Sequence, residues 1–165
     1  MNPIRLPRLA APLGLAAALA ATLGAQTLTA PMAVFKDGQA TSTAQSGTAA
    51  TLAVNGSATP SVAWTTFQTA GIDRATVIKA VLALNVRGVT TAGTLRVHAL
   101  TAAVTAPEAS VPLASIPYNP AVVIASAPLA AADVGKVIQL DITAAVKSGT
   151  FNGVALSSNT GLVAT

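Results

Sequence analysis

The sequence predicts an all-β fold, a jelly-roll-like antiparallel β-sandwich preceded by an N-terminal signal helix. Apolar and polar side chains alternate over several short segments, and turn-forming residues separate these segments about every 8–12 residues. The first 25 residues have the composition of an export signal. A barrel is the alternative all-β arrangement.

The N-terminal segment predicts export. Residues 1–8 carry Arg5 and Arg8 and no acid, residues 9–23 are almost purely Leu and Ala, and small residues follow at Gly24 and Ala25. The apolar run is shorter than the roughly 20 residues that span a bilayer as a helix. We therefore expect a signal peptide over residues 1–25, a linker over 26–32 and the β-sandwich domain over 33–165. The mature chain would be secreted or held at the cell surface, outside the membrane. Cleavage after Ala30 and an uncleaved anchor are the alternatives.

The clearest predicted strand covers residues 77–87, where a period of two places alternate side chains on one inward face. That inward set is Ile78, Ala80, Leu82, Leu84 and Val86. Residues 94–101 alternate in the same way after a glycine-flanked link, so the two segments predict a hairpin.

Further segments predict the rest of the sheets. In residues 136–142, Ile138, Leu140 and Ile142 face inward, and Val154 and Leu156 mark a later strand. Residues 50–54 and 61–68 flank Asn55-Gly56, a dipeptide typical of tight hairpin turns. Residues 107–128 hold five prolines and predict an extended loop with one short strand at 122–125. Residues 143–147 predict a single helical turn, capped by Thr143 and ended by Gly149.

The amino-acid composition argues against some classes of function. Hydrophobic residues make up 52% of the 165-residue chain and charged residues 8%, against roughly 25% charged in an average protein. No run of Lys or Arg interleaves with aromatic residues, which argues against nucleic-acid binding. The chain has no cysteine, so the fold depends on burial and hydrogen bonding, and a thiolate metal site is excluded.

Two segments carry a resemblance to a known family. Residues 75–101, ATVIKAVLALNVRGVTTAGTLRVHALT, and residues 137–158, VIQLDITAAVKSGTFNGVALSS, resemble the DNRLRE (disaggregatase-related) domain over roughly residues 33–163. Gln68 stands where that family has an acid, its Trp-x-Glu segment has no counterpart, and the chain ends at Thr165 where the family continues through one more strand. The resemblance implies a secreted sandwich similar to carbohydrate-binding modules, with no established catalytic residues.

The titratable residues do not predict an enzyme. His98 is the only histidine, and Arg96 on the same strand face disfavours the imidazolium that a general base must become. The acids each have a local structural role available, and Asp141 is expected to accept from backbone amides of the following turn. The acids are Asp37, Asp73, Glu108, Asp133 and Asp141. Asp37 with Gly38, or Asp141, could contribute to a structural calcium site, but no Asp-rich loop is present, so no metal or cofactor is predicted.

Two functions remain. The first is a non-catalytic surface or matrix module that binds polysaccharide, because sugar rings commonly stack on exposed aromatic side chains. Trp64 and Tyr118 are the candidate ligand-binding residues, with core packing of Trp64 and a covering role of Tyr118 as the alternatives. The second is a self-associating structural or scaffold subunit, because few charges guard the strand edges. The predicted partners are therefore polysaccharide or other copies of the chain.

Overall fold

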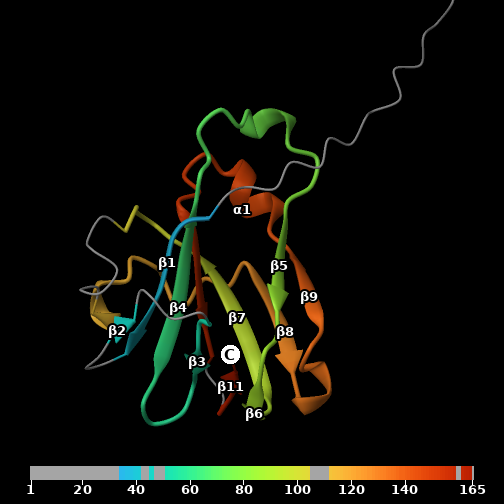
Figure 1. The fold of residues 1–165 in the computed structure, drawn as a ribbon. Helices are drawn as coiled ribbons and strands as arrows, with labels where there is room; N and C mark the ends of the chain where they lie inside the picture. The colour runs from blue at the N-terminus through green and yellow to red at the C-terminus, as the bar shows by residue number, and fades with distance from the viewer. Residues whose placement is uncertain (1–33, 42–44, 47–50, 105–111, 159–160, 165) are drawn as a thin grey trace, which may run out of the picture. The chain divides into compact units, whose positions relative to one another are not determined.

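The computed structural model describes residues 34–41, 45–46, 51–104, 112–158 and 161–164 (Figure 1). The chain divides into two units, Met1–Ala30 and Pro31–Thr165, and all described residues belong to the second. The predicted signal segment and linker lie outside the described residues. The second unit is all-β and antiparallel, as the sequence predicted.

The larger sheet has nine strands, seven of them in the order β6-β11-β3-β4-β10-β7-β8, while β1 pairs with β4 and with β2. Its strands are β1 (Val34–Thr41), β2 (Gln45–Ser46), β3 (Val54–Asn55), β4 (Ser61–Phe67), β6 (Val89–Thr91), β7 (Gly93–Ala99), β8 (Ala125–Leu129), β10 (Gly153–Ser157) and β11 (Val163–Ala164). Pro128 lies in β8, an edge strand, where a missing backbone N–H costs no ladder bond.

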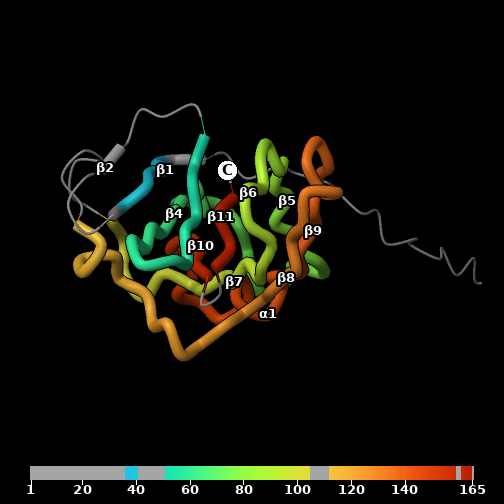
Figure 2. Tube along the Cα trace, turned by 90° about the horizontal axis from the view of Figure 1, so that it is seen from below, coloured from blue at the N-terminus to red at the C-terminus, as the bar shows by residue number. Residues whose placement is uncertain are grey.

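The smaller sheet consists of β5 (Val81–Asn85) and β9 (Val137–Asp141), paired antiparallel from Val81 opposite Asp141 to Asn85 opposite Val137. Seen from below, β5 and β9 lie between β6 and β8, the two ends of the ordered path of the larger sheet (Figure 2). The strands therefore enclose a common interior. The arrangement is a sandwich whose two sheets come close to forming a barrel.

The interior contains the larger of two buried clusters. Alternate residues of β5 and β9 point inward, as predicted: Leu82 and Leu140 are buried and Leu84 and Ile138 are partly buried. They pack against the inner face of the larger sheet, which contributes Ala63, Leu95, Val97, Val154 and Leu156. Burial of this aliphatic layer is the main stabilising contribution in a chain without disulfides.

Two predictions about the first strands are wrong. The segments at 77–87 and 94–101 do not form a hairpin: β5 pairs with β9, and β7 pairs with β10 and β8. Strand β5 begins only at Val81, so the alternation does not extend back to Ile78, which is 73% exposed. A 3-10 turn at Arg74–Thr76 precedes residues 77–80, and these four residues are not part of the strand.

Other local predictions hold with changes in detail. β3 and β4 form a hairpin, with Asn55 opposite Ser61. Neither Asn55 nor Gly56 has the positive φ that a tight turn needs, so a longer loop connects the two strands. The helical turn α1 (Thr143–Lys147) has its predicted extent, and Gly149 follows with φ of 85°. Thr143 does not cap it; its hydroxyl instead accepts from the Ala80 amide at 2.9 Å, which ties α1 to the start of the β5 segment.

Two further strand predictions differ in outcome. Val154 and Leu156 are buried in β10, as predicted. The short strand predicted at 122–125 is found later, as β8 at Ala125–Leu129. The last strand that the structure describes, β11, pairs with β3 and β6.

Candidate functional site

The residues predicted to contact a sugar lie on the outer face of the larger sheet. A row of directly opposite residues crosses four strands there: Gly38 on β1, Trp64 on β4, Ala155 on β10 and His98 on β7. Opposite residues in antiparallel strands share a face, so these four side chains are neighbours. The two small residues beside Trp64 leave space for the indole. An alanine Cβ at Gly38 would lie only 2.8 Å from Cζ2 of that ring.

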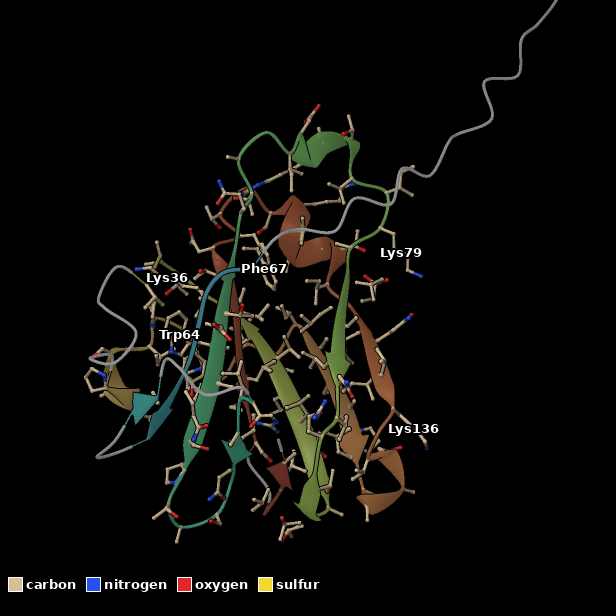
Figure 3. The ribbon with its side chains drawn as sticks, viewed as in Figure 1. Lys36, Trp64, Phe67, Lys79 and Lys136 are labelled. Carbon is tan, nitrogen blue, oxygen red and sulfur yellow. The ribbon has the colours of Figure 1, made fainter. Side chains whose placement is uncertain are left out.

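Trp64 is buried, which agrees with core packing, one of its two predicted roles, and not with an exposed sugar platform. The side chain is 1% exposed and belongs to a second buried cluster on this outer face (Figure 3). The cluster exists because the chain after β7 folds back over the sheet and covers it. Its other members are Ala40, Val62, Leu100, Val104, Ile116 and Ala155. Since neither face of the indole is open, Trp64 packs the core and offers no platform for a sugar ring.

Tyr118 is only partly buried and packs against the edge of that second cluster. Its ring centroid lies 5.0 Å from that of His98, at an interplanar angle of 50°. The loop that carries it is anchored to Thr101, whose amide and hydroxyl both donate to the carbonyl of Pro117, at 2.7 and 3.0 Å. Burial raises the pKa of the Tyr118 phenol, so the hydroxyl stays protonated at neutral pH. The ring is therefore held in one orientation, with part of its surface accessible.

His98 is 1% exposed, and both of its ring nitrogens have partners. Nδ1 lies 2.8 Å from the carbonyl oxygen of Val122 and Nε2 lies 2.8 Å from Oγ of Ser157. A carbonyl can only accept, so Nδ1 carries the proton and Nε2 accepts from the Ser157 hydroxyl. Burial is the largest cause that lowers the pKa of His98, and the nearby Arg96 lowers it further, while the Val122 contact opposes the shift.

The Ser157–His98 contact has the spacing of a nucleophile and a base, and sequence reasoning missed it because 59 positions separate the two residues. The alternation of β10 is a signal that could have placed Ser157 on the outer face, since Val154 and Leu156 point inward. A nucleophilic pair also needs an orienting acid and an oxyanion site. Here the group that orients His98 is the neutral carbonyl of Val122, and the nearby charged residue is the cation Arg96. We interpret the contact as structural: it joins β7, β10 and the segment before β8.

Three of the four acids that the structure describes, Asp73, Asp133 and Asp141, have local hydrogen-bond partners. Asp141 accepts from the Thr143 amide at 2.9 Å, which confirms the predicted role in the following turn. The side chain and then the amide of Thr143 lower the pKa of Asp141. Asp133 accepts from the Ala130 amide at 3.0 Å and from Lys136 at 3.2 Å. Asp73 accepts from the amide of Ala75 at 3.1 Å.

The described residues contain neither a cluster of metal ligands nor a membrane-spanning helix. Among them, no group of three His, Asp or Glu side chains is placed to hold a metal ion. Glu108 lies outside the described residues. No described helix has the length and apolar character needed to cross a membrane.

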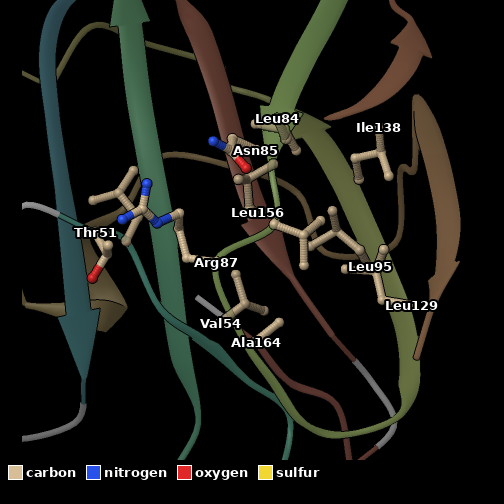
Figure 4. A pocket seen from close by; sticks show the side chains of 12 residues that line it. Thr51, Val54, Leu84, Asn85, Arg87, Leu95, Leu129, Ile138, Leu156 and Ala164 are labelled. Carbon is tan, nitrogen blue, oxygen red and sulfur yellow. The ribbon is translucent and has the colours of Figure 1, made fainter. Parts of the chain in front are cut away.

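An apolar cavity of about 400 Å³ opens at the end of the interior near β3 and β11 (Figure 4). Its walls come from both sheets and are aliphatic: Leu52, Val54, Leu84, Val86, Leu95, Leu129, Ile138, Leu156 and Ala164. Three polar residues complete the lining, Thr51, Asn85 and Arg87, and all three are exposed. Alternation alone could not reveal the cavity, since it predicts which side chains point inward but not whether they fill the space.

The outward face of the β5–β9 pair is the third notable surface. Val81 and Val137, near opposite ends of this face, are 41% and 58% exposed. Ile78 and Val134, which precede the two strands, are 73% and 45% exposed. We call these four side chains the aliphatic face. On this face Ala83 and Gln139 lie between Val81 and Val137. Exposed aliphatic side chains in one region of a surface are typical of association sites.

Fold and surfaces together define an all-β antiparallel sandwich with a partly filled interior and an exposed aliphatic face. No protein-family model matches the sequence, and no curated protein matches it at a significant level. The resemblance to the DNRLRE domain stays a prediction.

Proposed function

We propose that this chain is an exported, non-catalytic structural module that associates with copies of itself through the aliphatic face. The observation that carries the proposal is the exposure of four large aliphatic side chains on and beside β5 and β9, up to 73% for Ile78. Export is supported by the order of Arg5 and Arg8, the Leu/Ala run and Ala25 at the N-terminus.

The charge pattern favours a second copy as the partner. Charged residues make up only 8% of the chain, so two copies repel each other weakly. Asp141 stands at one end of the β5–β9 face and Lys136 precedes the other end. A two-fold axis that crosses the strands would bring each Asp141 toward the Lys136 end of the other copy. Apolar and charged groups would then be complementary in the same arrangement.

Analytical ultracentrifugation of the full chain over a range of concentrations tests this proposal. The wild type should form oligomers in a concentration-dependent way, and Val137→Lys should shift the population toward monomer, because a buried unpaired ammonium opposes association. Val122→Lys is the matched control, since Val122 is 54% exposed and lies in the loop before β8.

The same N-terminal segment is present in all three proteins, so the comparison isolates the aliphatic face. A wild type that stays monomeric at every concentration would contradict the proposal. So would equal effects of the two lysine substitutions.

Polysaccharide binding is the second candidate, and the rigid, partly exposed ring of Tyr118 is the observation that favours it. A ring fixed before binding loses little conformational entropy when a sugar stacks on it. Thr101 and Asn119 lie next to it on the same loop system and carry polar groups that could orient a sugar. The burial of Trp64 leaves Tyr118 as the one aromatic contact retained from the sequence prediction.

Affinity electrophoresis in gels that contain soluble polysaccharides tests this candidate. Tyr118→Ala should abolish any retardation, while Tyr118→Phe should keep most of it, because stacking depends on the ring rather than the hydroxyl. Both variants need an unchanged far-UV circular dichroism spectrum. Equal retardation of the wild type and Tyr118→Ala would rule out Tyr118 as the contact.

A further inference from the structure

The interior is filled unevenly along its length. Phe67, at the last residue of β4, stacks on Phe151, which precedes β10, with ring centroids 6.1 Å apart. The opposite end, where β4 begins, has no aromatic side chain in its lining and contains the cavity of about 400 Å³. This volume falls within the range of about 300–1,000 Å³ found for small-molecule sites. Aliphatic side chains from both sheets form the wall, so an alkyl chain is the group that fits it.

The cavity lining includes three exposed polar residues, Thr51, Asn85 and Arg87. Arg87 is exposed, and it forms no ion pair or hydrogen bond with any residue that the structure describes. Asn85 and Thr51 also line the cavity and carry an amide and a hydroxyl (Figure 4). A guanidinium without a carboxylate partner matches the geometry of a carboxylate ligand, which it can bind through two parallel N–H groups.

We propose that this cavity binds an alkyl carboxylate, with the hydrocarbon chain in the aliphatic interior and the carboxylate at Arg87. Two features carry the proposal together: an open apolar cavity lined by side chains of both sheets, and a cation in its lining that has no ion pair or hydrogen bond among the described residues. The inference goes beyond the proposed function, because Leu84 and Val86 form part of the cavity wall, whereas self-association uses the exposed aliphatic face.

Isothermal titration calorimetry of the full chain with decanoate tests the site, below the concentration at which decanoate forms micelles. Decanol and decyltrimethylammonium have the same alkyl chain without the negative charge. Decanoate should bind with a stoichiometry of one. The two other compounds should bind roughly tenfold more weakly or not at all, because each lacks the charge-assisted hydrogen bonds to the guanidinium.

Two variants locate the ligand. Arg87→Gln should weaken decanoate binding roughly tenfold. The matched control Lys147→Gln removes an exposed cation from α1 and should leave binding unchanged. Leu84→Phe adds volume to the cavity wall and should abolish binding while the thermal unfolding transition is retained.

Each alternative outcome has a definite meaning. Absence of decanoate binding up to about 1 mM would overturn the proposal, since that is weaker than a specific site requires. Equal binding of all three compounds, or equal affinities of Arg87→Gln and the wild type, would overturn the role of Arg87. Undiminished binding to a folded Leu84→Phe would place the ligand outside the cavity.

Discussion

Gly38 and Trp64 provide the sharpest test of the second core. Gly38 lies directly opposite Trp64, and an alanine Cβ there would be 2.8, 2.9 and 3.0 Å from three atoms of the indole. Non-bonded carbon atoms attract best at about 3.5–4.0 Å, so the ring would have to move by at least roughly 0.7 Å. The ring is 1% exposed and enclosed by the chain that covers this face, so it cannot move freely. Overpacking of this kind costs about 1–3 kcal/mol of unfolding free energy.

A double-mutant cycle measured by urea unfolding, with far-UV circular dichroism as the signal, separates this clash from other effects. Gly38→Ala should lower the unfolding free energy by about 1–3 kcal/mol in the wild type. In a Trp64→Leu background the same change should cost nothing, because the obstructing ring is gone. That background is itself destabilised, by up to about 3–5 kcal/mol.

Gly161→Ala is the matched control for this cycle. Its Cβ would meet only Cγ2 of Thr91, at an ordinary 3.8 Å, and the unfolding free energy should change little. An equal cost of Gly38→Ala in both backgrounds would refute the placement of the indole beside Gly38.

Three further predictions follow from burial and backbone geometry. Gly153→Ala should lower the free energy of unfolding in urea by about 2–5 kcal/mol, because φ at this residue is 143° and the new Cβ would press against the Thr65 carbonyl oxygen. Gly149 has a φ of 85° and open space around it, so Gly149→Ala should lower the same free energy by only about 1 kcal/mol. Trp64, the only tryptophan, should emit at short wavelength and resist acrylamide quenching until the chain unfolds. His98 has a lowered pKa in the folded state, so its contribution to stability is complete above its unfolded value of about 6.5 and is lost as pH falls below that value. His98→Gln should flatten this part of the stability–pH curve, and an unchanged slope would contradict the neutral, buried histidine.

Local patterns predicted much of the fold because their physical causes are local. The alternation in residues 136–142 corresponds to β9, where Leu140 is buried, and the 143–147 segment is the helical turn α1. Asp141 accepts from the backbone of the next turn, as its position before Thr143 indicated. Each of these features depends on residues a few positions apart.

Strand pairing was less accessible to local reasoning. β5 lies close in sequence to β7, which suggested a hairpin, but it pairs with β9 more than fifty positions later. Period-two alternation shows which face of a strand is buried and says nothing about its neighbour. The burial of Trp64 depends likewise on Leu100, Val104 and Ile116, which fold over it from the chain after β7.

The sequence by itself determined the β class, the inward sets of β5 and β9 and the turn at Asp141, because neighbouring side chains and backbone dihedral preferences decide them. Tertiary structure alone decided the role of each candidate residue. It buried Trp64 under a returning loop, brought Ser157 to His98 and left a cavity beside Arg87. Those outcomes depend on how completely distant segments cover one another, and the order of residues along one strand carries no information about that.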